Sequence, residues 1–244
     1  MIPTTDCGNV ILMSVADDIK MNAAATFGKQ WTVRDGLVVP AATDLKMTND
    51  AVRFETATIL YADLDGSTDL VGGKKWEFAG EVYKTFLYAA SRLIRKHGGA
   101  IISYDGDRVM GIFISKQQRN EAASCALEIN YAVKNVVQTE LNKRWTTDFN
   151  IRHVIGIDTS TIRAARTGVR GDNDLVWIGN AANLAAKLTA LSADNPTWIT
   201  KRVYDYLDAP QKKGAQGEDI WRKWKWSEHN EDEIYSSTYW RSFT

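Results

Sequence analysis

Two aspartates adjoin apolar, β-favouring runs of this 244-residue chain. Asp63 follows the run 58–62, and Asp107 precedes the run 109–114. If these runs are neighbouring strands of one sheet, both carboxylates lie at the same edge, and Mg²⁺ and Mn²⁺ prefer such oxygen ligands. Acidic residues are also common in turns that bind nothing, so the spacing alone leaves a purely structural role open.

Further polar residues stand where a nucleotide could be held. Gly66, Ser67 and Thr68 follow Asp63, and small residues at the start of a helix can surround a phosphate with backbone N–H groups. Asn183 and Lys187 are four residues apart, on one polar face of an expected helix. An amide and a cation on one face can bind a ribose oxygen and a phosphate, although a solvated helix face has the same pattern.

The elements that must position these residues follow from hydrophobic periodicity. Steps of two indicate strands, steps of three and four indicate helices, and the Asp-Gly pair before Asp107 indicates a hairpin. The mixture of hairpins and helical crossovers predicts an α+β sheet with helices on one face. The expected elements are a strand at 58–62, a helix at 74–97, hairpin strands at 100–103 and 109–114, a helix at 117–143, a strand at 149–157, a Gly- and Arg-containing stretch at 161–174, an apolar run at 175–178, a helix at 180–191 and a strand at 197–200.

Composition excludes several classes of function. The chain carries 30 Lys and Arg against 30 Asp and Glu and is 44% hydrophobic, which is typical of a globular protein without a cationic surface for nucleic acid or anionic lipid. No apolar run reaches the roughly 18 residues that a membrane span needs. Cys7 and Cys125 form no metal-type or redox-type pair, which favours a reducing cytoplasmic location. The histidines, His97, His153 and His229, are too scattered for a zinc or haem site.

The C-terminal segment is rich in tryptophan. Residues 221–244 hold four of the nine tryptophans, and cations interleave with them at 221–226. The same segment has four cations and four acids, which argues against nucleic-acid binding. We expect a strand pair whose tryptophans pack on the core or on a partner subunit.

Three blocks, 62–68, 104–113 and 179–188, resemble in order and spacing the catalytic segments of class III nucleotidyl cyclases. The resemblance covers about residues 56–206. It implies a ferredoxin-like βαββαβ core as the catalytic domain, with an N-terminal extension at 1–55 and a C-terminal Trp-rich extension at 207–244 that packs on the core.

The resemblance also implies a role for each residue. Asp63 and Asp107 match the aspartates that hold two Mg²⁺ or Mn²⁺ ions, with the Leu64 carbonyl as a further ligand. Asn183 matches the asparagine that orients the ribose. Lys187 stands where the family has an arginine on the transition-state phosphate, which keeps the charge but loses the planar fork. In the family the last two come from the opposite subunit, which implies a head-to-tail homodimer with composite active sites.

The positions that read the base depart from the family pattern. Adenylate cyclases have a lysine at the position of Ser103 and an aspartate or threonine at that of Val176, and the pair that reads guanine is missing as well. A degenerate pseudo-enzyme and a cyclase for another base both fit this departure. The retained aspartates, asparagine and cation favour the second. Tyr104 and Trp177 flank the altered positions, and we expect them to fill the space that a smaller pyrimidine leaves empty.

This combination is most similar to the pyrimidine cyclases of bacterial Pycsar antiphage systems. It implies cyclisation of UTP, or alternatively CTP, to the 3′,5′-cyclic monophosphate and pyrophosphate, as an infection signal for a separate effector protein. Two other hypotheses stay open: a non-catalytic nucleotide sensor on the cyclase fold, and an adenylate or guanylate cyclase with atypical base-reading residues.

Overall fold

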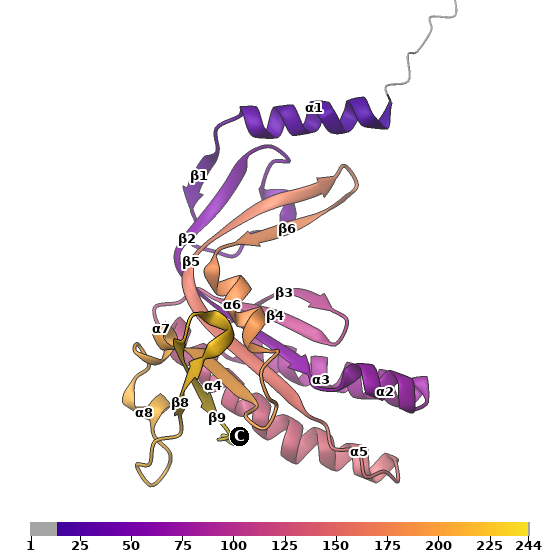
Figure 1. The fold of residues 1–244 in the computed structure, drawn as a ribbon, viewed down its shortest axis with the longest axis vertical. Coiled ribbons are helices and arrows are strands. Elements are labelled where there is room, and N and C mark those ends of the chain that lie inside the picture. The colour runs from indigo at the N-terminus through magenta and orange to yellow at the C-terminus, as the bar shows by residue number, and fades with distance from the viewer. Residues whose placement is uncertain (1–13, 244) are drawn as a thin grey trace, which may run out of the picture.

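The computed structural model describes residues 14–243, so Cys7 lies outside the described residues. A single mixed sheet of nine strands, counted over that part of the chain, forms the centre of the molecule (Figure 1). Its main order is β3-β4-β2-β5-β7-β9-β8, with β1 beside β2 and β6 beside β5. The strands are β1 Thr32–Asp35, β2 Asp50–Leu64, β3 Ala100–Asp105, β4 Arg108–Phe113, β5 His153–Val169, β6 Asp172–Ile178, β7 Thr197–Thr200, β8 Arg222–Trp226 and β9 Asp232–Ser237.

The two long strands β2 and β5 tie the molecule together. They pair antiparallel from Leu64 and His153 at one end to Ala51 and Ala165 at the other, with one irregularity after Phe54. Their far ends, together with β1 and β6, form a four-stranded extension that we call the arm (Figure 1). The sequence predicted a strand only from residue 58 and left 161–174 without a strand. The structure corrects both, because β2 begins at residue 50 and residues 161–174 form the end of β5 and the start of β6.

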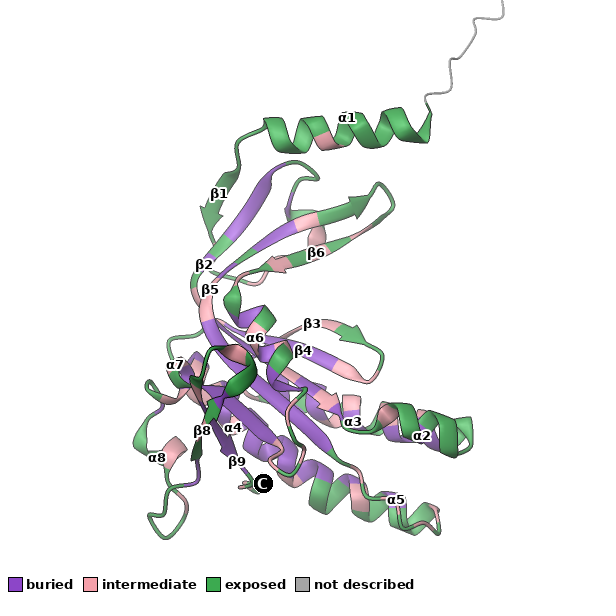
Figure 2. Cartoon of the chain, in the orientation of Figure 1, coloured by how far each residue is buried: buried purple, intermediate pink, exposed green. Residues whose placement is uncertain are grey.

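Three helical elements cover one face of the sheet, which we call the closed face. They are α3 Trp76–Lys96, α4 Gln118–Tyr131 and α5 Gln138–Arg144, the last two joined by a π-helical segment, Ala132–Val137. Because strand side chains alternate, Leu60, Ala62 and Ile157 point to this face, where they pack against α3 residues such as Phe86 in the main hydrophobic core. Burial is concentrated here, between the sheet and these helices (Figure 2).

The helix α6, Asn180–Leu188, lies on the other face of the sheet, which corrects the expectation that all helices share one face. Its Ala181 and Ala185 pack against Ile59 and Ile162. The helix lies so close to β5 that a Cβ on Gly156 would be 2.1 Å from the Ala185 carbonyl oxygen. Periodicity shows which side of a helix is apolar but not which face of a sheet it covers, so this placement could not be derived from the pattern.

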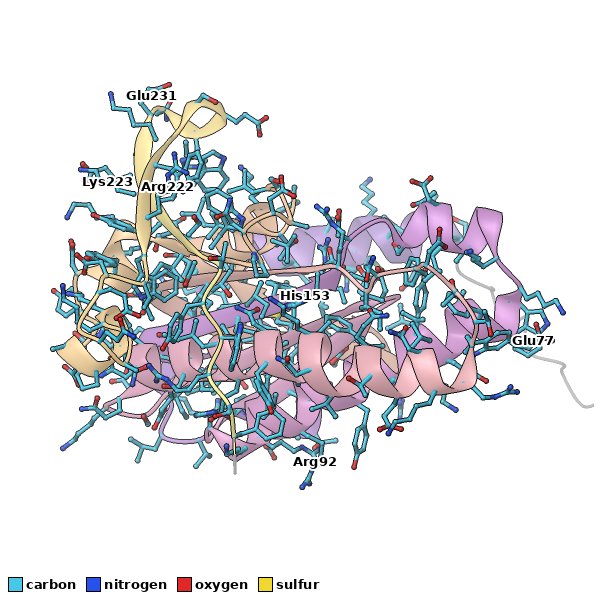
Figure 3. All side chains as sticks on the ribbon, turned by 90° about the horizontal axis from the view of Figure 1, so that it is seen from below. Glu77, Arg92, His153, Arg222, Lys223 and Glu231 are labelled. Carbon is cyan, nitrogen blue, oxygen red and sulfur yellow. The ribbon has the colours of Figure 1, made fainter. Side chains whose placement is uncertain are left out.

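The remaining elements extend the core at both ends. On the N-terminal side are α1 Val15–Gly28 and a 3-10 turn, Ala42–Asp44, and α2, Ser67–Gly73, follows β2. After β7 come α7 Lys201–Tyr204 and α8 Ala209–Lys212, followed by the β8–β9 hairpin. Trp221 and Trp226 are buried against the chain's own core, whereas Arg222 and Lys223 lie on the projecting part of the hairpin (Figure 3). None of the helices within 14–243 is long and apolar enough to cross a membrane.

Candidate active site

Asp63 is the penultimate residue of β2, and its side chain points to the face that carries α6. Strand alternation dictates this direction, because Ala62 and Leu64 on either side belong to the core of the closed face. The carboxylate is 16% exposed and pairs with Arg108, the first residue of β4, at 2.6 Å from Nη2 to Oδ2 and 3.0 Å from Nε to the same oxygen. Pairing of Ala62 with Val109 in the next strand places Arg108 there.

Asp107 occupies the turn between β3 and β4. Asp105 pairs with Arg108, so Gly106 and Asp107 form a two-residue hairpin loop in which Gly106 has φ +60°, a conformation that glycine adopts without strain. The Oδ2 atom of Asp107 is buried and has no hydrogen-bond partner among the described residues. A buried carboxylate oxygen without a partner is costly, and a bound cation would relieve that cost.

The two carboxylates influence each other electrostatically. Burial is the largest cause that raises the pKa of Asp63, and the negative charge of Asp107 raises it further. The guanidinium of Arg108 opposes both effects. A second positive charge would therefore stabilise the ionised pair, so these residues fit a divalent cation.

The number of protein ligands at this site is small. Over residues 14–243 there is no group of three or more His, Cys, Asp or Glu side chains arranged for a metal ion. A cation held by Asp63 and Asp107 would need further oxygen ligands. The Leu64 carbonyl and the phosphates of a nucleotide are the candidates, since Mg²⁺ commonly combines one or two carboxylates with substrate phosphates.

The loop after β2 carries the predicted phosphate-binding residues. Gly66 has φ +73° and precedes α2, and Ser67 and Thr68 are the first residues of that short helix. The loop is fixed at two points. The Tyr83 hydroxyl donates to the Ser67 carbonyl at 3.2 Å, and the Asp65 carboxylate accepts from Arg152 Nε at 2.9 Å.

The polar residues of α6 do not join the aspartates within one chain. Ala181 and Ala185 are buried against the sheet, and Asn183 and Lys187 consequently point outward and are exposed. Within the described residues neither has a side-chain hydrogen bond or an ion pair. It is Thr189, just after the helix, whose hydroxyl lies 3.5 Å from Asp63 Oδ2. Each chain thus presents two separate halves of the predicted site.

The predicted base-reading residues of β3 point to different faces. Ser103 is half-buried and pairs with Met110, which places it on the face of Asp63 and Arg108. Tyr104 lies on the closed face, where its hydroxyl is 2.9 Å from the Ser91 hydroxyl of α3. Its predicted part in base recognition stays a prediction.

The corresponding residues of β6 also alternate. Val176 is 40% exposed and points to the side of β6 opposite to Trp177. The Trp177 ring stacks on Phe54 at 6.2 Å between centroids, and its Nε1 is buried without a partner among the described residues. The part of Trp177 in base recognition likewise stays a prediction.

Sequence reasoning missed Arg108, Tyr61 and Thr189. Arg108 contacts Asp63 and also lies over the Tyr61 ring, with 5.8 Å from Cζ to the ring centroid. The sequence did contain a signal for Arg108. A two-residue Gly106-Asp107 turn makes Arg108 the first residue of the strand that follows, next to the predicted metal-binding Asp107. No local signal pointed to Thr189, because its contact with Asp63 spans 126 residues.

Comparisons with known proteins identify the family to which the chain is similar. Residues 50–223 match the family model described as the adenylate and guanylate cyclase catalytic domain. A uridylate cyclase from Burkholderia cepacia is 52% identical over 88% of this chain and 94% of its own length. A uridylate cyclase from Xanthomonas perforans is 42% identical over 94% of this chain and 99% of its own length.

The fold is also found among solved structures. The crystal structure of the adenylyl cyclase CyaB from P. aeruginosa superposes with a TM-score of 0.60 at 21% identity, over 77% of this chain and 95% of that chain. The family model covers more than half of the chain, and the two relatives are aligned along nearly their whole length. The chain therefore belongs to the family of adenylate and guanylate cyclase catalytic domains, the class III nucleotidyl cyclases.

Proposed function

We propose that this cyclase converts UTP to 3′,5′-cyclic UMP and pyrophosphate. The observation that carries the proposal is the identity of 52% and 42% with uridylate cyclases along nearly their whole length. The chain's own residues support catalysis rather than nucleotide sensing, since both aspartates, Asn183 and the cation Lys187 are present together.

The choice of base is supported by the two altered positions. Ser103 has no charge to read a purine carbonyl or ring nitrogen, and Val176 has no hydrogen-bonding group at all. The side chains that read adenine and guanine in adenylate and guanylate cyclases are therefore missing here, which disfavours ATP and GTP. CTP shares the ring size of UTP and is the competing substrate.

The metal requirement follows from the aspartate pair. We propose that Asp63 and Asp107 hold two Mg²⁺ or Mn²⁺ ions, and the unpartnered Oδ2 of Asp107 is the structural support for this. Bound there, the ions would lower the pKa of the ribose 3′-hydroxyl and neutralise the triphosphate. Arg108 would then give up part of its contact with Asp63 or share that carboxylate with the ions.

In the proposed reaction the ribose 3′-oxygen forms a bond to the α-phosphorus, the bond from that phosphorus to the bridging oxygen breaks, and pyrophosphate leaves. The 3′-proton passes to solvent. In a homodimer, Asn183 of the partner subunit would hold the ribose in the attacking conformation, and Lys187 of the partner subunit would offset charge that grows on the α-phosphate. Both side chains are exposed and have no hydrogen bond or ion pair in the part of the chain that the structure describes, which supports this assembly.

We further propose that cyclic UMP acts in the cytoplasm as an antiviral signal of the Pycsar type, read by a separate effector protein. The similarity to pyrimidine cyclases supports this role. The assay that tests the proposed reaction incubates the protein with each of the four ribonucleoside triphosphates and Mn²⁺, then separates the products. We expect cyclic UMP and pyrophosphate, lost on addition of EDTA. Equal or greater turnover of CTP, or four blank reactions, would overturn the proposal.

A further inference from the structure

Arg152 joins two segments at one end of the central sheet. The backbone pairing of β2 with β5 continues one residue beyond the strands, because the Asp65 N–H donates to the Arg152 carbonyl at 3.0 Å. The side chains of this cross-strand pair also meet, with 2.9 Å from Arg152 Nε to Asp65 Oδ2. The same guanidinium donates from Nη2 to Asp194 Oδ1 at 3.1 Å. One side chain thus connects the segment after β2 with the segment after α6.

The segment after α6 is anchored on both sides of Asp194. Before it, the Ser192 carbonyl accepts from Trp198 Nε1 at 3.1 Å, and this tryptophan is only 5% exposed. After it, the Pro196 carbonyl accepts from the Ile155 N–H at 2.8 Å. Asp194 therefore offers Arg152 a fixed point in the fold.

The segment after β2 has fewer anchors. It consists of residues 65–68, which we call the phosphate loop, and it leads into α2, a largely exposed helix in which Leu70 is buried (Figure 2). Among residues 14–243, the side chains that hydrogen-bond to the phosphate loop are those of Tyr83, at the Ser67 carbonyl, and Arg152. The position of the loop therefore depends strongly on Arg152.

The position of the loop matters because of the residues on either side of Asp65. Asp63 lies two residues before it, and Gly66, Ser67 and Thr68 follow it directly. In the proposed site the first of these holds a metal ion and the other three surround phosphates. A shift of the loop would misdirect backbone N–H groups that must all point at one triphosphate.

We infer that Arg152 is a positioning residue that holds the phosphate loop in the conformation that binds a nucleoside triphosphate. The inference rests on the proposed function, which places the phosphates at this loop. Two nitrogens of the guanidinium already contact carboxylates of the chain, so Arg152 acts through Asp65 rather than by touching the substrate. Because the loop contacts phosphates in the ground state and in the transition state alike, a displaced loop raises KM and leaves kcat almost unchanged.

The first test compares Arg152→Gln with Arg95→Gln. Arg95 is exposed on α3 and has no ion pair or side-chain hydrogen bond within the described part of the chain, so its variant removes the same charge without breaking a contact. KM and kcat are measured for whichever nucleoside triphosphate the wild-type chain cyclises. For Arg152→Gln we expect KM to rise about fivefold with kcat within about twofold of wild type, and for Arg95→Gln no change. Arg152→Lys should restore part of the loss, since an ammonium can pair with one carboxylate but lacks the planar fork. An unchanged KM in Arg152→Gln would overturn the inference.

A double-mutant cycle with Asp65→Ala tests whether the effect passes through Asp65. Removal of a negative charge close to the phosphates would by itself lower KM, whereas loss of the anchor raises it. We expect Asp65→Ala to raise KM, and Arg152→Gln to add less than about a twofold rise in that background. A rise in KM that is as large without Asp65 as with it would contradict the inference, because Arg152 would then act by another route.

Hydrogen exchange gives a readout that needs no substrate. The Leu70 and Lys74 N–H groups of α2 donate to the Gly66 and Leu70 carbonyls at 3.0 Å and 3.2 Å. Both amides should exchange faster in Arg152→Gln than in wild type or Arg95→Gln. The midpoint of denaturant unfolding should stay the same, because exposed ion pairs contribute little to stability.

The exchange rates also separate this inference from the proposed function. If the wild-type chain cyclises none of the four ribonucleoside triphosphates, the proposed function fails, and faster α2 exchange in Arg152→Gln still shows that Arg152 holds the loop. If the wild-type chain is active and the α2 amides exchange equally in all three proteins, the role of Arg152 is removed and the proposed function stands.

Discussion

Two polar clusters on opposite faces of the central sheet, one around His153 and one around Asp63, differ in how completely they are satisfied. On the closed face, buried His153 bonds to the Asn130 side chain at 2.8 Å, and the Asn130 amide donates to Thr197 Oγ1 and to the Tyr239 carbonyl at 2.9 Å each. At the Asp63 side, the Asp107 Oδ2 has no partner among residues 14–243, and Arg108 balances only part of the negative charge. The same strands therefore carry a hydrogen-bonded polar cluster on one face and, on the other, a site whose negative charge is only partly balanced and which would bind a cation.

The largest expected effect comes from removing one carboxylate of the aspartate pair. Asp107→Asn keeps the shape of the side chain but removes the charge that a cation needs, so cyclase turnover should fall on the order of 10⁴-fold, about 5 kcal/mol of transition-state stabilisation. The melting temperature should stay the same or rise, because a buried unpaired charge is removed. Steady-state pyrophosphate release and thermal unfolding measure the two effects. Asp105→Asn, an exposed acid in the same hairpin, is the control and should keep its turnover.

The closed face should show the opposite pattern. Phe86 is fully buried in α3, and truncation by Phe86→Ala should lower the free energy of unfolding by about 4 kcal/mol through lost burial and a cavity. Turnover per folded molecule should change little, because the ring lies on the far side of the sheet from Asp63. Tyr88→Ala removes an aromatic ring that is 68% exposed on the same helix and is the matched control. Denaturant unfolding of the wild type and both variants measures the free energies of unfolding. Equal losses of stability in Phe86→Ala and Tyr88→Ala would contradict the packing.

Much of this two-sided arrangement was predictable from local pattern. The continuous β-favouring run 58–62 placed Asp63 at a strand end, and the Asp-Gly turn placed Asp107 beside a second strand. What could not be predicted is non-local. The end of β5 pairs with β2 as far as Ala165 and with β6 from Arg163 to Val169, and these non-local pairings make residues 161–169 a strand. The side of the sheet that α6 covers depends on Gly156, which looks in sequence like an ordinary strand residue.

The predicted base-reading residues show the same limit. Their spacing fixed positions along the chain, but the face on which each side chain lies depends on register. Ser103 pairs with Met110 after an irregularity in the β3–β4 ladder, and that shift decides which of Ser103 and Tyr104 faces Asp63. A bulge of one residue has no clear sequence signal here, so the direction of Tyr104 could not be derived.

Acid should lower the stability of the folded protein through His153, which is buried on the closed face. Burial lowers the pKa of this histidine to about 4, from about 6.5 when unfolded. The unfolded chain therefore binds the proton first as the pH falls, and stability should drop between pH 6.5 and 4 by about 3 kcal/mol from this group. His153→Gln, which still can donate to Asn130, should remove that part of the pH dependence. Chemical denaturation at several pH values measures it, and parallel curves for the two proteins would contradict the assignment. Figure 3 shows His153 in the interior, as the prediction requires.

The smallest expected effect concerns Lys187, the residue that the proposed composite site takes from the partner subunit. Lys187→Ala should reduce turnover by about 100-fold, because a cation near the α-phosphate is lost, and Lys187→Arg should restore most of it. Neither change should alter stability, since Lys187 is exposed and has no ion pair within the described residues.

Mixing chains then locates that lysine relative to the aspartates. Asp107→Asn and Lys187→Ala should each retain at most about 1% of wild-type turnover alone, but in a mixed dimer one composite site would keep its aspartates from one chain and its Lys187 from the other. Random pairing of equal amounts makes half of the dimers mixed, with one intact site of two, so about a quarter of wild-type turnover should return. If Lys187 acted within its own chain, no mixed dimer would hold an intact site and the mixture would stay at the level of the separate variants. The size of the recovered rate therefore distinguishes an active site shared between two chains from one that each chain completes by itself.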